Sequence, residues 1–375
     1  MRKLNMVEAV CLIAGAGIGG GVMALPYLAA GTGFWPAVFI MLIAYIITVV
    51  LHIMVAELSI RTEYSSELLT IFSKHLFRGK KTLRSIFYVL MAITLICNLA
   101  AYITGAGDIL ADLMGIPIII AEILFFICAA VVVALGLKRV AINEAVTLAV
   151  MLAILAFLVV RTFTLPSHQP FAIAHWEPFP LMAVYGMAMF SLSSLFAVPQ
   201  AASGLRGDKS QLRTAVTMGL LINLAVMIIV TLSVLFSADP VTEVAIVGWA
   251  AALGGSTRVF GSLFIALAML GTFWSISLQL SDMTREYFSA GRFWAWLIAT
   301  APSFILALLP VSGFLGLMQI AGGATAVIVA CMAVPAYRNA IHGADGLLLG
   351  NLGKSRVLSG VIVIMYLLMA AAPLL

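Results

Sequence analysis

Two short segments contain too much glycine or serine for the apolar runs in which they lie. Residues 15–21 read Gly-Ala-Gly-Ile-Gly-Gly-Gly, and residues 190–195 read Phe-Ser-Leu-Ser-Ser-Leu. Each interior glycine costs a helix about 1 kcal/mol relative to alanine, so a continuous helix through the first segment is unfavourable. Serine hydroxyls can pair with backbone groups that an unwound turn releases. Both segments are therefore predicted to break the helices that contain them.

A helix that is broken in this way has groups that can bind a zwitterion. The first N–H groups of a half-helix, at the positive end of its dipole, can hold a carboxylate without any arginine. Free carbonyls and hydroxyls in the second segment can accept hydrogen bonds from an ammonium group. The predicted binding residues are Ala16, Gly17, Ile18, Gly19 and Gly20 in the first segment, and Phe190, Ser191, Ser193 and Ser194 in the second.

The glycines have a second interpretation, which is close packing of one membrane helix on another. Gly15 and Gly19, and likewise Gly17 and Gly21, have the spacing of small residues at such contacts. The sequence alone leaves both interpretations open.

Composition defines the class of protein that must position these segments. The chain has 375 residues, of which 63% are hydrophobic and 9% are charged, and its mean hydropathy is +1.17. A soluble domain has about 25% charged residues, so a soluble enzyme and a disulfide scaffold are excluded. We expect an all-α polytopic membrane protein in contact with lipid. The net charge of +5 does not require a nucleic-acid partner, because the positions of the basic residues explain it.

The apolar runs predict eleven membrane spans, since about 20 apolar residues cross a bilayer as a helix. With the N-terminus inside and the C-terminus outside, every lysine and arginine except Arg161 and Arg258 falls on the inner side, as the positive-inside rule requires. The segments are 6–31, 34–60, 84–111, 116–137, 140–162, 179–204, 214–236, 257–288, 292–310, 313–337 and 357–374.

The two unusual segments continue in a similar way, which predicts an internal repeat. Residues 24–31 read Ala-Leu-Pro-Tyr-Leu-Ala-Ala-Gly, and residues 197–204 read Ala-Val-Pro-Gln-Ala-Ala-Ser-Gly. Five spans separate them, so the two elements run in opposite directions. Paired broken helices in an inverted repeat point to the midplane binding site of a transporter. We expect one transmembrane domain, with a first repeat at 6–162, a second repeat at 179–337 and an extra span at 357–374.

Residues 15–26, followed by Ala30 and Gly31, resemble the first-span signature of the amino acid/auxin permease family. The run from Ala101 to Leu110 resembles the third span of the bacterial aromatic amino acid permease branch, although Asp108 is unusual there. This resemblance implies a LeuT-type fold of five plus five inverted spans, with broken spans 1 and 6 and one appended span. It also implies coupled uptake of amino acids and a Tyr102 side chain that covers the substrate.

The resemblance further implies a sodium site formed by the Ala14 and Gly17 carbonyls with Thr272 or Ser275. The last two lie on a polar face of their helix that also carries Gln279, Asp282 and Glu286. Proton coupling would instead need a buried acid, for which Asp108 and Glu122 are the deeper candidates. Glu8, Glu57 and Glu144 are predicted near inner span ends, where they can pair with loop cations.

We therefore predict a secondary active transporter of the cell membrane. It would import amino acids by alternating access as a monomer, driven by a sodium or a proton gradient, with no cofactor besides that ion. The alternatives are an amino acid exchanger and a membrane sensor of amino acids that does not transport. An enzyme is not expected. Residues 105–108 match the Gly-x-Gly-Asp of intramembrane aspartyl proteases, but the Tyr-Asp partner motif is absent from the sequence.

Overall fold

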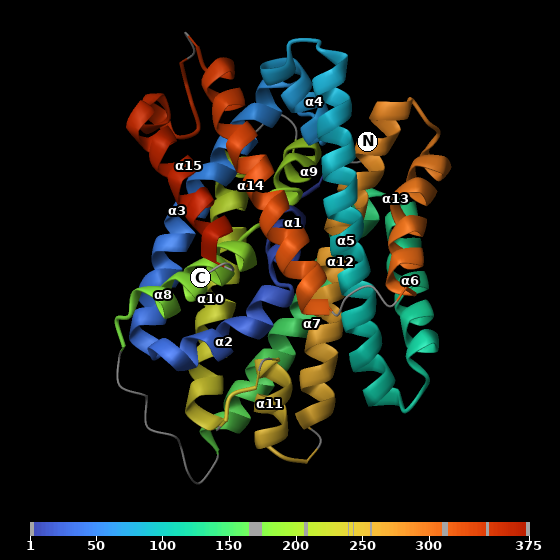
Figure 1. Ribbon diagram of the computed structural model, residues 1–375, viewed down its shortest axis with the longest axis vertical. Helices are drawn as coiled ribbons and strands as arrows, with labels where there is room; N and C mark the ends of the chain where they lie inside the picture. The colour runs from blue at the N-terminus through green and yellow to red at the C-terminus, as the bar shows by residue number, and fades with distance from the viewer. Residues whose placement is uncertain are drawn as a thin grey trace.

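A computed structural model describes residues 4–164, 175–205, 209–238, 240–242, 244–255, 257–309, 314–342 and 345–372, without the side chains of 314–316 and 318–326. Every regular element in these ranges is helical (Figure 1). The first half contains α1 (Met6–Gly17), α2 (Gly20–Thr32), α3 (Phe34–Arg61), α4 (Leu68–Phe72), η1 (Ser73–Phe77), α5 (Lys81–Met114), α6 (Ile118–Leu135) and α7 (Leu137–Phe163). The second half contains α8 (Pro178–Ser191), α9 (Ala197–Gly204), α10 (Lys209–Ser237), α11 (Ala245–Ala252), α12 (Thr257–Phe288), α13 (Arg292–Ala307), α14 (Phe314–Ala340), η2 (Gly350–Lys354) and α15 (Arg356–Ala371).

The long helices have the length and composition of membrane spans. Six of them, α3, α5, α6, α7, α10 and α12, are each apolar enough to cross a bilayer, and α1 with α2 can form a seventh, bent span. The helices α8, α13 and α15 are shorter. The sixteen residues of α15 extend about 24 Å at 1.5 Å per residue, which is less than the hydrocarbon core. The total of eleven spans thus stays a prediction. The short helices α4, η1 and α11 occupy segments that the sequence predicts only as connections.

Both predicted helix breaks are present. The α1 helix ends at Gly17, α2 begins at Gly20, and their axes differ by 53°. Residues 192–196 likewise separate α8 from α9, directly after the first serine of the second segment. Pro199 lies in the first turn of α9, where its missing N–H costs no hydrogen bond.

The broken helices lie at the centre of the bundle. The α1 helix packs against α7, α10 and α12, and α2 packs against α8 (Figure 1). Within the apolar windows of the long helices, 72% of α12 is buried but only 33% of α6. Thus α12 is an inner helix beside the breaks, whereas α6 is peripheral.

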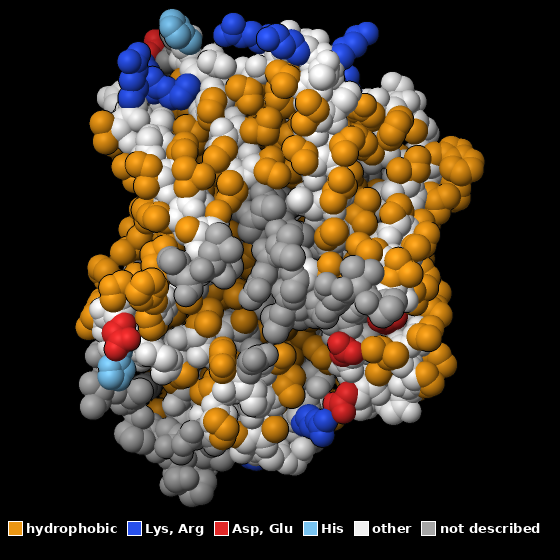
Figure 2. Space-filling model, in the orientation of Figure 1, with side chains coloured by type: hydrophobic (Ala, Val, Ile, Leu, Met, Phe, Trp, Pro, Cys, Tyr) orange, Lys and Arg blue, Asp and Glu red, His pale blue; other side chains and the backbone are white. Residues whose placement is uncertain are grey.

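The side chains on the surface are distributed as in a membrane protein. Apolar side chains cover the sides of the bundle, and Lys and Arg side chains gather at the end that carries α4 and the start of α15 (Figure 2). Many large apolar side chains on α3, α6 and α7 are exposed. In water this surface would be unfavourable, but in a bilayer it contacts lipid.

Candidate functional site

A small cavity lies where the two helix breaks meet, and its volume is about 40 Å³. The cavity is lined by eleven of the predicted site residues: Ala16, Gly17, Gly19, Gly20, Tyr102, Phe190, Ser191, Ser193, Ser194, Thr272 and Ser275. Gly21, Asn98, Phe196 and Ile276 complete the lining. Residues that are far apart in the sequence, on α2, α5, α8 and α12, therefore converge on one space.

The alternate glycines of the first break each face a different polar side chain. A Cβ on Gly15 would collide with the Glu144 carboxyl, and one on Gly17 would collide with the Asn223 amide. These contacts come from α7 and α10, so the glycines do not form one stripe for a single neighbouring helix. The glycines thus allow polar side chains of two neighbouring helices to approach the backbone closely, and both interpretations of these residues stay open.

The start of α2 is surrounded by hydroxyl groups. A Cβ on Gly19 would lie 2.6 Å from Thr272 Oγ1 and 3.4 Å from Tyr102 Oη. A Cβ on Gly21 would collide with Ser191 Oγ of the other broken helix. The first N–H groups of a helix have no partner within it, and here they begin in the wall of the cavity. This arrangement can hold a carboxylate.

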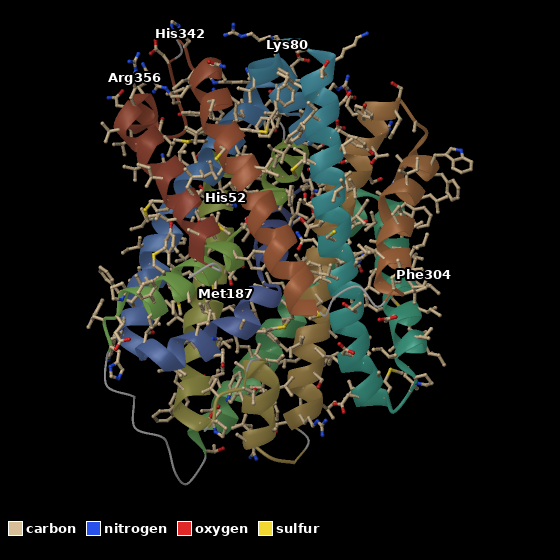
Figure 3. The ribbon with its side chains drawn as sticks, viewed as in Figure 1. His52, Lys80, Met187, Phe304, His342 and Arg356 are labelled. Atoms are coloured by element: carbon tan, nitrogen blue, oxygen red, sulfur yellow. The ribbon has the colours of Figure 1, made fainter. Side chains whose placement is uncertain are left out.

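The second break is tied to its surroundings through Ser194. Its hydroxyl donates to Ile13 O of α1 at 2.7 Å, and its backbone N–H donates to His52 Nε2 of α3 at 2.9 Å. Ser191 Oγ donates to Met187 O of its own helix at 2.8 Å. Figure 3 shows His52 and Met187 inside the bundle, far from Lys80 and His342 at the basic end. Ser194 thus links the second break to α1, whereas Ser191 bonds within its own helix, and both hydroxyl oxygens can still accept hydrogen bonds.

Within the part of the chain that the structure describes, two buried polar atoms at the cavity lack a hydrogen-bond partner. They are Asn98 Oδ1 on α5 and Ser275 Oγ on α12. A buried acceptor without a partner is unfavourable, so both are suited to an ammonium group or a cation. Asn98 and Tyr102 share one face of α5, and this spacing is the signal in the sequence that would have added Asn98 to the site.

The residues of the predicted sodium site are only partly brought together. Thr272 Oγ1 donates to Ala268 O at 3.2 Å and lies 3.5 Å from Ile18 O. The Ser275 carbonyl accepts a hydrogen bond from Gln200 Nε2 at 3.1 Å. Ala14 and Ile18 are fully buried beside the break and are not part of the cavity wall.

The acids divide into three groups. Glu8 pairs with Lys138 at 2.5 Å and Glu57 pairs with Arg61 at 2.7 Å, as predicted. Glu144 does not follow this prediction: it is 1% exposed, its Oε1 atom has no hydrogen-bond partner, and it forms no ion pair within the described ranges. It lies two turns inside α7, and its carboxyl group faces Gly15 of the broken helix and Gly271 of α12.

Asp108 and Glu122, the predicted proton relay, lie near each other and away from the cavity wall. Glu122 is 5% exposed on α6 and packs against Gly107, whereas Asp108 on α5 is exposed. Their proximity agrees with the predicted pair, but neither residue lies at the helix breaks or at the cavity wall.

The sequence model of the tryptophan/tyrosine permease family matches residues 2–340. The chain belongs to this family. Tyrosine-specific transport system 1 of Haemophilus influenzae is 25% identical and aligns with 84% of the chain and 83% of its own length. Glutamine transporter 2 of Aliivibrio fischeri is 21% identical, over 82% of the chain and 81% of its own length.

The crystal structure of MhsT in complex with L-phenylalanine has a similar fold. It matches with a TM-score of 0.72 and 14% identity, covering 99% of each chain. The permease is therefore an all-helical, multi-pass membrane protein of LeuT-type fold and an amino acid transporter, and its relatives are transporters and not enzymes.

Proposed function

We propose that this permease imports an α-amino acid by alternating access, using the energy of a sodium or a proton gradient. The observation that carries the proposal is the cavity lined by both broken helices. The N–H groups at Gly20 and Gly21 would hold the substrate carboxylate. Asn98 Oδ1 and the free carbonyls near Ser193 would accept hydrogen bonds from the ammonium group. Paired breaks at the middle of a bundle allow one half to rock against the other around a fixed site.

The side chain of the substrate would lie against Phe190, Phe196 and Ile276. This part of the wall is apolar and aromatic, which favours an aromatic or large aliphatic amino acid over glutamine. Aromatic rings contribute to binding through edge-to-face and stacked contacts.

The proposal includes an orientation and a repeat. The end of the bundle that carries Lys80 and Arg356 would face the cytoplasm, following the positive-inside rule. The N-terminus would then be inside and the C-terminus outside. Segments 6–162 and 179–337 would form an inverted repeat, for which the two matched breaks are the support. If sodium is the coupling ion, it would bind to the carbonyls of Ala14 and Gly17 together with Thr272 or Ser275. The permease would work as a monomer.

Binding can be tested on the purified permease by thermal unfolding with a panel of amino acids. A ligand at about 100 times its Kd adds roughly 2.7 kcal/mol of stability. We expect tyrosine, tryptophan or phenylalanine to raise the Tm and glutamine to raise it less. The D-enantiomers serve as controls, since the carboxylate and ammonium sites are fixed relative to each other. A Tm that no amino acid changes would contradict the proposed site.

A further inference from the structure

Glu144 is a buried carboxyl group that the proposed amino acid site does not use. It lies on α7, its side chain is 1% exposed, and Oε1 has no hydrogen-bond partner among the described residues. Its neighbours are Gly15 on α1 and Gly271 on α12. It therefore contacts the two helices that also form the cavity, on the side of α1 that faces away from Asn223.

The two glycines leave room for this carboxyl group. A Cβ on Gly271 would lie 2.8 Å from Glu144 Oε2 and 3.3 Å from Oε1, and one on Gly15 would collide with the same carboxyl. Any larger residue at either position would displace the side chain. Gly15 lies in the last turn of α1, directly before the break. A change in the charge of the Glu144 carboxyl group can therefore act directly on α1, next to its break.

The other charged groups nearby are occupied or distant. On α1, Cys11 is a free thiol, and Glu8 pairs with Lys138. On α12, the charged residue Asp282 lies about three turns from Gly271. An unpaired carboxylate in a low-dielectric interior costs several kcal/mol. The side chain is consequently stable in this place only when one positive charge neutralises it.

We propose that Glu144 takes up one proton as the coupling cation, and that its occupancy controls the position of α1 against α7 and α12. The inference rests on the proposed transport function. With the cation bound, the neutral site allows the packing seen here. Without it, the carboxylate is unfavourable between the glycines and favours a conformation that admits water or a new cation. A cation stabilises one conformation only through such a difference in affinity.

The test is Glu144→Gln in proteoliposomes, because glutamine has the same shape and no charge to neutralise. Two rates are measured: accumulation of a labelled amino acid under a gradient, and counterflow of labelled against unlabelled amino acid without a gradient. Coupling energies of 1–3 kcal/mol correspond to about 5–150-fold effects, so we expect accumulation to fall at least about tenfold. Counterflow should continue at close to the wild-type rate.

Two further variants sharpen the result. Asp112→Asn removes a carboxyl that forms an exposed ion pair with Arg258, and it should behave as wild type. Glu122→Gln tests the rival buried acid. Gradient-driven accumulation that is normal in Glu144→Gln, or lost in Glu122→Gln instead, would overturn the inference. Wild-type accumulation is also measured with a proton gradient in sodium-free buffer, where we expect it to continue. Accumulation that occurs only with a sodium gradient at equal pH would overturn the inference.

A loss of both rates in Glu144→Gln is resolved by ligand binding. The wild-type permease should bind its amino acid in a way that depends on the coupling cation, and Glu144→Gln should bind without that dependence. Binding that keeps the wild-type dependence, or no binding at all, would overturn the role of Glu144. If the wild-type permease shows neither counterflow nor binding with any amino acid, the proposed transport function itself fails, and this outcome is distinct.

Discussion

The backbone N–H of Ser194 donates a hydrogen bond to Nε2 of His52 at 2.9 Å, within the unwound turn between α8 and α9. Because Nε2 accepts this hydrogen bond, the ring hydrogen must be on Nδ1, which lies 2.7 Å from Thr48 O. His52 is fully buried. A neutral imidazole with both nitrogens paired thus supports one of the two helix breaks from α3.

Replacing His52 with phenylalanine should destabilise the permease. The ring volume is nearly kept, but the Ser194 N–H loses its acceptor inside the bundle, which costs about 1–3 kcal/mol. The Tm should fall, and uptake should fall with it. His52→Gln, whose amide oxygen can accept the same hydrogen bond, should recover part of the loss. Equal Tm values for wild type and His52→Phe would show that the contact is dispensable.

Gly20→Leu should abolish uptake while leaving expression largely intact. Gly20 lies in the cavity wall at the start of α2, and a leucine there would fill the space for the substrate carboxylate. Gly31→Leu is the matched control, because a Cβ on Gly31 of the same helix meets open space. Uptake and surface expression are measured for both. Normal uptake by Gly20→Leu would remove the argument for an anion site at this helix end.

The double change Thr272→Val and Ser275→Ala tests the sodium site. Both hydroxyls lie at the cavity, and that of Ser275 has no partner. If these oxygens bind sodium, the sodium concentration for half-maximal uptake should rise several-fold. The measurement is uptake at graded sodium concentrations with the pH held constant. An unchanged response would exclude these two hydroxyls as sodium ligands.

Stability near the basic end should depend on pH through Glu67. This residue precedes α4 outside the spans, and burial, with the negative charges of Asp282 and Glu286, raises the pKa of its carboxyl to about 7. The folded state therefore binds a proton that the unfolded state releases above about pH 4.5. Stability should decrease as the pH rises through 7. Thermal unfolding of wild type and Glu67→Gln between pH 5 and 8 checks this, and parallel curves would contradict it.

The helix breaks and most of the cavity could be predicted from local sequence. Glycine and serine weaken a helix wherever it packs, so residues 15–21 and 190–195 indicated the breaks before any contact was known. Tyr102 and Thr272 followed from helix periodicity together with the family resemblance. The ends of the long helices were also predictable, because the thickness of the bilayer sets the length of the apolar segment that crosses it.

The partners of these segments could not be predicted. Glu144 was expected to pair with loop cations, since sequence position gives its depth along α7 but not the face toward which it points. His52 and Asn223 each lie in apolar runs without a motif, and their importance depends on contacts with Ser194 and Gly17. Such contacts join α3 to the second break and α10 to the first, and only the packed bundle determines them.

The most direct test of the central claim is uptake of labelled amino acids into proteoliposomes that contain only this permease. Uptake is compared under a sodium gradient, under a proton gradient and without a gradient. Gradient-driven accumulation of at least one amino acid, abolished by Gly20→Leu, is the predicted result. Folded and inserted protein that accumulates no amino acid under either gradient would contradict coupled transport.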